Sequence, residues 1–297
     1  MPTTFDATVR HTGLTFGESP RWHDGRLWFS DFFRHGVFSL GDDGERLEHT
    51  VATQPSGLGW TDDGSMLVVS MIDKKLLAID ADGAVRQHAD VSEYCGYWAN
   101  DMVVAPDGTA YVGNFGFDFD AWFAEHGIQG LFETPGPPTT NIVVVAPDGS
   151  IRQVVAEMAF PNGMVLTEDG ATLIAAETMG QRLTAFDVAT DGTLSNRRVF
   201  AQFQLVFPDG ICLDAEDQVW IANAASPECL RIAEGGEVTA KLVTSQPSYA
   251  CMLGGEDGCT LFAMTAPTST ASALSGELRG QASVEAAIVE VPGAGHP

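Results

Sequence analysis

The sequence lacks the features of nucleic-acid-binding proteins and of membrane proteins. Lys and Arg number only 15 against 40 Asp and Glu, which gives a formal net charge of −25 at pH 7. A surface this acidic repels phosphate backbones and anionic lipid headgroups. No apolar run approaches the roughly 18 residues that a membrane-spanning helix needs. We therefore expect neither a nucleic-acid partner nor a membrane partner.

Cysteine is scarce and shows no pairing pattern. The number is odd and no pair is spaced as CxxC: Cys95, Cys212, Cys229, Cys251 and Cys259. The first twenty residues also lack the basic start and apolar core of a secretory signal. We expect free thiols and a cytoplasmic location. The oligomeric state, monomer or homo-oligomer, is left open.

Several common catalytic motifs are missing as well. No HExxH, GxSxG, GxGxxG or Walker A pattern occurs. These absences give no support to a zinc protease, a serine hydrolase with a nucleophile elbow, or an enzyme with a nucleotide cofactor.

What the sequence does contain is a regular series of Asp-Gly turns. Asp-Gly between apolar or alternating segments is a strong signal for a β-hairpin. One series places a turn aspartate before a short apolar strand six times: Asp24, Asp63, Asp107, Asp169, Asp217 and Asp257. A second series of Gly-containing turns lies between them, as in GDDGERLEH and APDGSIRQV.

Two hairpin turns in each period of about 40 residues give four strands per unit, and six units fit the chain. The sequence therefore predicts an all-β fold: a six-bladed β-propeller with four antiparallel strands per blade, as a single domain over residues 1–297. A two-sheet β-sandwich is the alternative. Strand-like runs end at Arg10 and begin at Glu285. Pairing an N-terminal strand into the last blade would close the ring.

One interval in the repeat is too long. Residues 116–140 are an excess segment with a helical candidate at Ala121–His126 and a Pro-rich end. A long insertion in a tight repeat is more often functional than structural, so we expect a lid or a pocket wall. The small, polar segment 268–280 is expected to be a surface loop of the last unit.

Oxygen-bearing side chains stand about seven residues before four of the first-series turns, where each innermost strand should begin. They lie in GESPRW, WANDMVV, FPNGMVL and FPDGICL: Glu18, Asn100, Asn162 and Asp209. The other two units have small residues there, Ser56–Gly57 and Ala250. Two carboxylates and two amide oxygens on one axis suit Ca²⁺, and less well Mg²⁺ or Mn²⁺. The alternative is that Asn-Gly and Asp-Gly simply form turns at these points.

The same four motifs resemble those of the gluconolactonase/regucalcin (senescence marker protein) family of six-bladed propellers, from about residue 10 to 292. In that family and in the related diisopropylfluorophosphatase, a Glu, two Asn and an Asp bind one divalent cation. The resemblance carries these roles over to Glu18, Asn100, Asn162 and Asp209. It implies hydrolysis of lactones, with Ca²⁺ as the first choice of metal and Mg²⁺, Mn²⁺ or Zn²⁺ as alternatives.

The sequence departs from the sugar-lactonase pattern in its pocket. Those relatives have an Arg two residues before the Asn, where this chain has Trp98, and a Glu where this chain has the stretch 113–118. The expected pocket is therefore more aromatic and less basic, which favours a more apolar lactone or ester. The predicted lining residues are Tyr97, Trp98, Phe115, Phe117, Trp122 and Met179.

Together these features predict a metal-dependent lactonase or ester hydrolase that acts on a small molecule. Asp209 is the candidate general base or nucleophile, and the second candidate catalytic residue, Asp101, would orient the ligands. Glu177, at the far end of an inner strand, is expected to be structural. The alternatives are a metal-stabilised binding protein without catalysis, and a strictosidine-synthase-like enzyme that would not need the four oxygen ligands.

Overall fold

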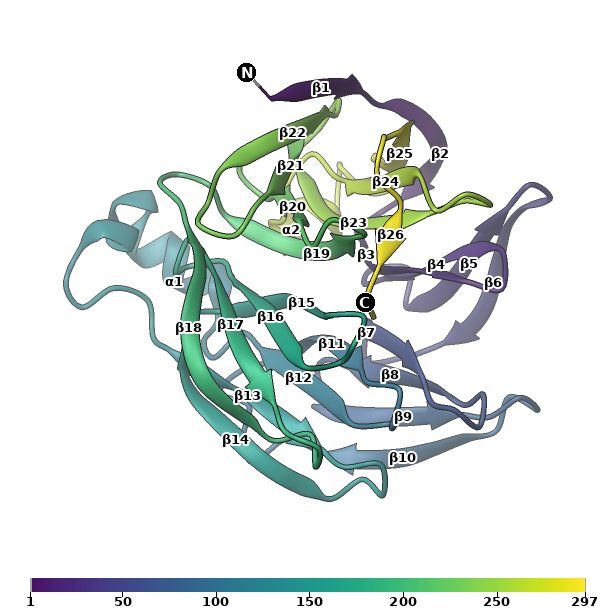
Figure 1. The fold of residues 1–297 in the computed structure, drawn as a ribbon, viewed down its shortest axis with the longest axis vertical. Coiled ribbons are helices and arrows are strands. Elements are labelled where there is room, and N and C mark those ends of the chain that lie inside the picture. The colour runs from purple at the N-terminus through teal and green to yellow at the C-terminus, as the bar shows by residue number, and fades with distance from the viewer. Residues whose placement is uncertain (1, 297) are drawn as a thin grey trace.

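The computed structural model describes residues 2–296, which form a ring of six β-sheets around a central axis (Figure 1). Five sheets have four strands and one has six. The six-bladed propeller is thus confirmed, and the sandwich alternative is wrong.

In blades 1 to 4 the strands run from the axis outward in chain order. Blades 1 to 3 consist of β3 (Gly17–His23), β4 (Arg26–Asp31), β5 (Gly36–Gly41) and β6 (Gly44–Thr50); β7 (Pro55–Trp60), β8 (Met66–Ser70), β9 (Lys75–Ile79) and β10 (Val85–Asp90); and β11 (Ala99–Val104), β12 (Ala110–Asn114), β13 (Thr140–Val145) and β14 (Ile151–Met158).

Blades 4 to 6 follow the same plan, with additions from the two ends of the chain. They consist of β15 (Pro161–Leu166), β16 (Thr172–Glu177), β17 (Arg182–Val188) and β18 (Leu194–Gln202); β19 (Pro208–Asp214), β20 (Val219–Asn223), β21 (Glu228–Ile232) and β22 (Val238–Val243), with β1 (Thr3–Asp6) and β26 (Gly293–Ala294); and β23 (Ser248–Gly254), β24 (Thr260–Thr265), β25 (Ala282–Ile288) and β2 (Thr8–Leu14).

The predicted first-series turns join the first and second strand of each blade. In four of them the aspartate carboxylate accepts a hydrogen bond at 2.9–3.0 Å from the backbone N–H two residues later: Asp63, Asp107, Asp169 and Asp257. This short side-chain bond substitutes for a backbone turn bond, which is why Asp is favoured there.

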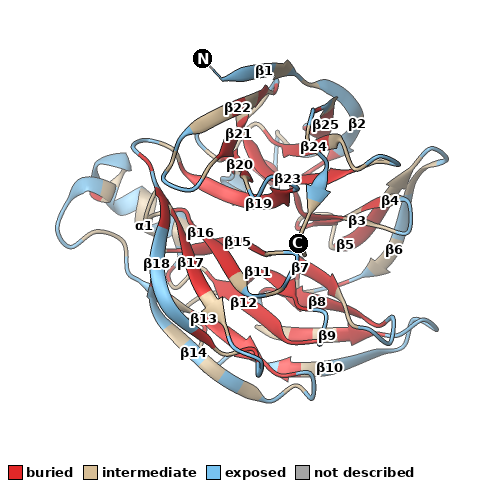
Figure 2. Ribbon diagram, in the orientation of Figure 1, coloured by how far each residue is buried: buried red, intermediate tan, exposed pale blue. Residues whose placement is uncertain are grey.

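Burial decreases from the axis to the rim, as Figure 2 shows. The inner strands β11, β15, β19 and β23 are buried throughout, whereas most residues of the outer strands β14 and β18 are exposed or half-buried. Blades pack face to face on their neighbours, so the inner strands have apolar contacts on both sides. The core therefore lies between blades and holds the inner strands in fixed positions.

The ring is closed by the N-terminal segment, as predicted, because β2 pairs antiparallel with β25 at the rim of blade 6. The segment that was expected to be one strand, TFDATVR, is divided, however. Residues 3–6 form β1, which pairs in parallel with β22 of blade 5, and the chain crosses to blade 6 after Asp6.

The C-terminal segment crosses the axis, where it lies near the centre of Figure 1. β26 pairs with Leu213 and Asp214 of β19, and His296 exchanges two backbone hydrogen bonds with Leu166 of β15. These contacts lie at the strand ends opposite those that carry Asp209 and Asn162. The chain terminus therefore covers part of that face and ties blades 4, 5 and 6 together.

Two segments outside the blades lie at the other face. The insertion forms α1 (Phe119–His126), capped by Asp118, and the short 3₁₀ helix η1 (Ile128–Phe132). Segment 268–280 connects β24 to β25 of blade 6 and is mostly exposed, as expected of a surface loop of the last unit; in addition it contains α2 (Ala271–Leu274), whose Leu274 is buried, and it reaches the cavity described below. Hydrophobic anchoring of Leu274 fixes this segment to the blade.

Among residues 2–296, no helix combines the length and apolarity that a bilayer crossing requires. The five cysteines are free, and four of them are buried. The cytoplasmic location stays a prediction.

Candidate functional site

The four predicted oxygen ligands occupy the same place in four blades. Each is the second residue of its inner strand: Glu18 in β3, Asn100 in β11, Asn162 in β15 and Asp209 in β19. All four are buried. Ser56 holds this place in β7, and Tyr249 holds it in β23, so the equivalent residue in blade 6 is Tyr249 and not the predicted Ala250.

A β-bulge lies at or next to the predicted ligand position in every inner strand. The register with the second strand shifts between Glu18 and Arg21 in blade 1, and in the other five blades the shift spans the equivalent residue, as between Ala99 and Met102 in blade 3. A bulge bends the strand and redirects a side chain. Repeated six times around one axis, it accounts for ligand side chains from separate blades converging at the same depth.

The glycines in PNG and PDG are explained by packing between blades. A Cβ atom on Gly163 would lie 2.5 Å from the backbone nitrogen of Ile211, and one on Gly210 would lie 2.6 Å from the Cβ of Ala250. Both glycines are within strands β15 and β19. The alternative interpretation, that these motifs are turns, is therefore wrong.

Hydrogen bonds connect the amide ligands around the axis. Ser56 Oγ donates to Asn100 Oδ1 at 3.2 Å, and Asn100 Nδ2 donates to Asn162 Oδ1 at 3.1 Å. Asn162 Nδ2 then donates to Thr178 Oγ1 at 3.1 Å. This chain fixes both amides with their nitrogens used as donors. Each Oδ1 retains a lone pair, because a carbonyl oxygen has two.

The two carboxylates of the site are held in an environment that opposes their charge. Burial raises the pKa of Glu18 well above its usual range, and the charges of Asp209 and Asp101 raise it further. Burial likewise raises the pKa of Asp209, with Asp101 adding to the effect. Asp209 Oδ1 has no hydrogen-bond partner among residues 2–296. A positive charge between these two carboxylates would favour the ionised form of both.

Asp101 lies beside the ligands rather than among the cavity residues. Its Oδ1 accepts a hydrogen bond from Ser19 Oγ at 2.5 Å. Burial raises the pKa of Asp101, and Ser19 and the guanidinium of Arg21 partly offset this. Arg21 in turn donates to the carbonyl oxygens of Pro20, Leu58 and Met102 in three successive inner strands. Asp101 therefore belongs to a network that fixes the strand beginnings.

The donor set fits a hard divalent cation. Glu18, Asn100, Asn162 and Asp209 offer only oxygen atoms, from two carboxylates and two amides, and Asp209 Oδ1 is free to bind. Oxygen-only sites suit Ca²⁺. Residues 2–296 contain no group of three or more His, Cys, Asp or Glu side chains placed to hold a metal. The predicted set differs from such a group in having two carboxylates and two amides.

A cavity of about 300 Å³ opens above the ligands. Glu18, Asn100, Asn162 and Asp209 line it, as do four of the predicted pocket residues, Tyr97, Trp98, Phe115 and Met179. The insertion contributes further lining residues: Asp118, Phe119, Asp120, Phe123, Ile128 and Leu131. The insertion is thus one wall of the cavity.

The other two predicted pocket residues lie behind this wall. Phe117 packs edge-on against Trp122 and against Phe160, with ring centroids 5.8 Å apart in both pairs. Trp122 also stacks on His126 at 4.7 Å. Phe117 and Trp122 therefore support the insertion and its contact with Phe160 rather than facing the cavity.

Sequence reasoning missed several lining residues, although one signal was available. An aromatic residue stands two positions before each of the four ligands and lines the cavity: Phe16, Trp98, Phe160 and Phe207. We call these four residues the aromatic collar. Only Trp98 was predicted. Tyr249 and Thr178 were also missed, because neither belongs to the four quoted motifs.

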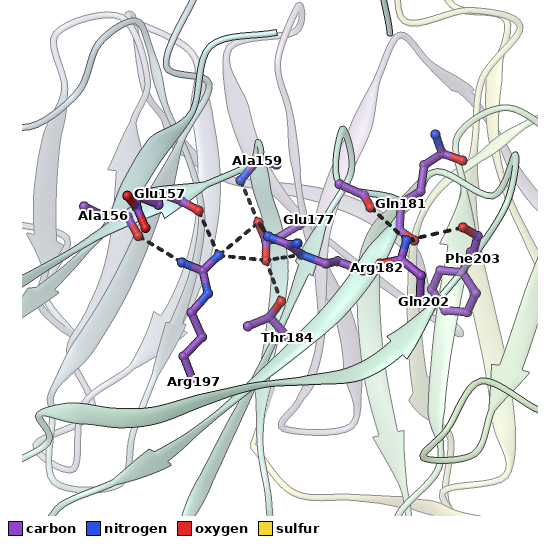
Figure 3. A network of polar contacts seen from close by, with 11 residues as sticks. Ala156, Glu157, Ala159, Glu177, Gln181, Arg182, Thr184, Arg197, Gln202 and Phe203 are labelled. Atoms are coloured by element: carbon purple, nitrogen blue, oxygen red, sulfur yellow. Dashed lines mark hydrogen bonds and ion pairs between the residues drawn. The ribbon is translucent and has the colours of Figure 1, made fainter. Parts of the chain in front are cut away.

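Glu177 is the centre of a structural network, which Figure 3 shows. Its carboxylate accepts hydrogen bonds from Arg182, at 2.8 Å to each oxygen, from Thr184 Oγ1 at 2.5 Å and from the backbone N–H of Ala159 at 2.6 Å. Arg197 Nη2 lies 3.3 Å from Glu177 Oε1. The arrangement agrees with the structural role expected for Glu177, since every bond ties one strand of blade 4 to another or to the segment before β15.

Comparison with known proteins gives a consistent result. Regucalcin of Xenopus laevis is 24% identical over 258 residues, which cover 84% of this chain and 83% of that protein. A pentonolactonase of Haloferax volcanii is 25% identical over 268 residues, covering 87% and 84%. The crystal structure of a calcium-binding regucalcin from Agrobacterium tumefaciens superposes with a TM-score of 0.79 at 21% identity, covering 100% and 99%.

The sequence profile described as "SMP-30/Gluconolactonase/LRE-like region" matches residues 16–267. The match spans all four ligand positions and most of the six blades. The chain belongs to the SMP-30/gluconolactonase/LRE-like family.

Proposed function

We propose that the chain is a lactonase, a hydrolase that opens a cyclic ester with water and uses one divalent cation, Ca²⁺ in the first place. The observation that carries the proposal is the cavity floor, where two buried carboxylates and two fixed amide oxygens meet and one carboxylate oxygen has no partner among residues 2–296. The family and its pentonolactonase member support the lactone as substrate.

Glu18, Asn100, Asn162 and Asp209 would hold the cation. When bound, it supplies Lewis-acid stabilisation of the negative charge that develops on the substrate carbonyl oxygen. Positive charge at this place also favours the ionised forms of Glu18 and Asp209, which burial alone disfavours.

Asp209 is the proposed general base. The carboxylate oxygen that does not hold the cation takes a proton from a water molecule while the water oxygen attacks the lactone carbonyl carbon. The bond between that carbon and the ring oxygen then breaks, and the proton passes to the ring oxygen, so that lactone and water give one hydroxy acid. Asp101 and Arg21 act as positioning residues through the strand beginnings.

The test combines metal analysis with hydrolysis. Purified protein is assayed on δ-gluconolactone, δ-valerolactone and a phenyl-substituted δ-valerolactone, before and after treatment with EDTA and after Ca²⁺ is returned. We expect about one bound cation per chain, loss of turnover with EDTA, and recovery with Ca²⁺. Hydrolysis of none of the three would overturn the proposal and favour a binding protein. Turnover that EDTA leaves unchanged would overturn the metal dependence.

Asp209→Asn separates the base from the ligand. We expect kcat to fall by about 10² to 10⁴, the usual contribution of general acid–base catalysis, with the cation still bound. Asp169→Asn, in an exposed turn of blade 4, is the matched control and should retain the wild-type rate. A near wild-type rate for Asp209→Asn would show that Asp209 is only a ligand.

A further inference from the structure

The aromatic collar repeats with the ligands around the axis. Phe16, Trp98, Phe160 and Phe207 each precede a ligand by two residues, so they come from the same four blades as the ligands and line the same cavity. A substrate whose carbonyl reaches the ligands lies in the cavity that these four rings line. The collar is therefore placed to contact groups attached near the carbonyl.

A second set of aromatic rings extends the collar on two sides. Phe115 stacks on Phe160 with centroids 4.9 Å apart and planes 17° apart, and Phe119 of α1 packs on Phe160 at 5.8 Å. Across the cavity, Phe16 packs on Phe32 at 5.3 Å and on Tyr249 at 4.7 Å. The result is two facing aromatic walls above the floor.

Phe160 is held in place by its backbone as well as its neighbours. Its φ of 63° lies in the left-handed region that a bulky residue seldom adopts. It is buried, and it contacts Phe115, Phe117 and Phe119. Unusual backbone conformations persist where the surrounding structure enforces them, often at ligand sites.

The two carboxylates in the cavity walls already accept hydrogen bonds from other residues of the chain. Asp118 accepts hydrogen bonds from the N–H of Ala121 and the hydroxyl of Tyr97, both at 3.0 Å, and Asp120 accepts one from the N–H of Ala271 at 3.2 Å. No Lys, Arg or His occurs among the described residues that line the cavity. A carboxylate or phosphate on the substrate would find no counter-ion in the walls.

We propose that the site takes lactones that carry a neutral apolar substituent, an aromatic ring or an alkyl chain, and that it selects against sugar lactones and anionic lactones. The inference rests on the proposed lactonase function and specifies its substrate class. The apolar group lies between the collar and α1, while the ester lies at the floor. The lining has hydrogen-bonding side chains such as Gln54, Thr178 and Ser269, but aromatic and aliphatic side chains predominate. Such a site gives a polyol few partners in exchange for the water that its hydroxyl groups lose.

The first test compares kcat/KM for a phenyl-substituted δ-valerolactone, δ-valerolactone and δ-gluconolactone, which share one ring size. We expect the phenyl lactone to exceed the sugar lactone by at least tenfold. A sugar lactone preferred by tenfold or more, or equal values for the two, would overturn the inference and leave the lactonase proposal intact. Hydrolysis of none of the three would overturn both.

A second test identifies the wall that contacts the substituent. Phe119→Ala removes a lining ring from α1, and Phe132→Ala is its control, because Phe132 lies on the same insertion, is 62% exposed and is not a lining residue. We expect Phe119→Ala to lower kcat/KM for the phenyl lactone at least fivefold more than for δ-valerolactone. Equal losses on both substrates would overturn the placement of the ring.

A third measurement does not depend on turnover. Calorimetric titration with a phenyl-substituted δ-valerolactam, which resists hydrolysis, should give a Kd at least tenfold lower than δ-valerolactam gives. Phe119→Ala should reduce this ratio and Phe132→Ala should not. A phenyl lactam that binds no more tightly than the unsubstituted lactam would overturn the inference even if lactones are hydrolysed.

Discussion

The carboxylate of Asp120 in α1 accepts a hydrogen bond from the backbone N–H of Ala271, the first residue of α2, at 3.2 Å. The two residues are 151 positions apart and come from blades 3 and 6. Both line the cavity. This bond joins the two segments that extend beyond the blades, so the insertion and the 268–280 segment form one continuous rim.

Asp120→Ala should loosen this rim. Because a single intramolecular hydrogen bond contributes about 0.5–1.5 kcal/mol, we expect KM for an apolar lactone to rise about twofold to tenfold. Faster hydrogen exchange in residues 268–276 should accompany it. Glu125→Ala, at an exposed position of the same helix, is the control and should change neither quantity. Unchanged exchange and KM in Asp120→Ala would show that the two segments are held independently.

Calcium should stabilise the folded protein through Glu18. A ligand that binds only the folded state at a hundred times its Kd adds about 2.7 kcal/mol to the free energy of unfolding. We expect an increase of this order when Ca²⁺ is added during urea unfolding, and its loss in Glu18→Gln. The exposed Glu168→Gln should keep the increment. Equal increments in Glu18→Gln and wild type would place the cation elsewhere.

Glu177→Gln should destabilise blade 4. The substitution removes the charge that Arg182 and Arg197 face in a buried position, and we expect a loss of about 2–3 kcal/mol in the free energy of unfolding. Urea unfolding at pH 7 measures it, with Glu168→Gln as the exposed control. A loss below about 0.5 kcal/mol would show that the network contributes little.

The same substitution has a defined pH dependence. Burial alone would raise the pKa of Glu177, but the hydrogen bonds from Arg182, Ala159 and Thr184 outweigh it and the pKa is lowered. A lowered pKa stabilises the folded state above the usual Glu pKa of about 4.3, and this contribution is lost as the pH falls through the folded value. The stability difference between wild type and Glu177→Gln should therefore shrink below about pH 4. A difference that grows in acid would contradict the network.

Gly295→Ala should release the C-terminal segment from the axis. A Cβ atom at this position would lie 2.3 Å from the carbonyl oxygen of Leu166, and its φ of +74° is in the left-handed region. Gly64→Ala is a matched control, because Gly64 has a φ of +82° with no atom within 4 Å of the added Cβ. In both variants an alanine must adopt a positive φ, which costs about 1–2 kcal/mol. Urea unfolding should show a clearly larger loss in the free energy of unfolding for Gly295→Ala than for Gly64→Ala. Equal losses in the two variants would show that the contact with Leu166 is dispensable.

The sequence determined the strands, the turns and the common place of the four predicted ligands, because these depend on local chemistry that recurs in each blade. Asp107-Gly108 and its equivalents specify a turn by their own hydrogen bonds, and the predicted ligand stands six to eight residues before the turn aspartate in all four blades. The residues Glu18, Asn100, Asn162 and Asp209 could therefore be aligned without knowing the fold in detail.

The sequence did not determine which side chains face the cavity. Phe117 and Phe119 are two residues apart in the insertion, yet Phe117 packs behind the wall and Phe119 lines it. The 268–280 segment looks like a surface loop because its own composition is small and polar, and only its bond to Asp120 gives it a place in the rim. Such contacts join segments far apart in the chain, and no local pattern encodes them. Closure of the ring brought these segments together, and packing between blades decided which side chains line the cavity.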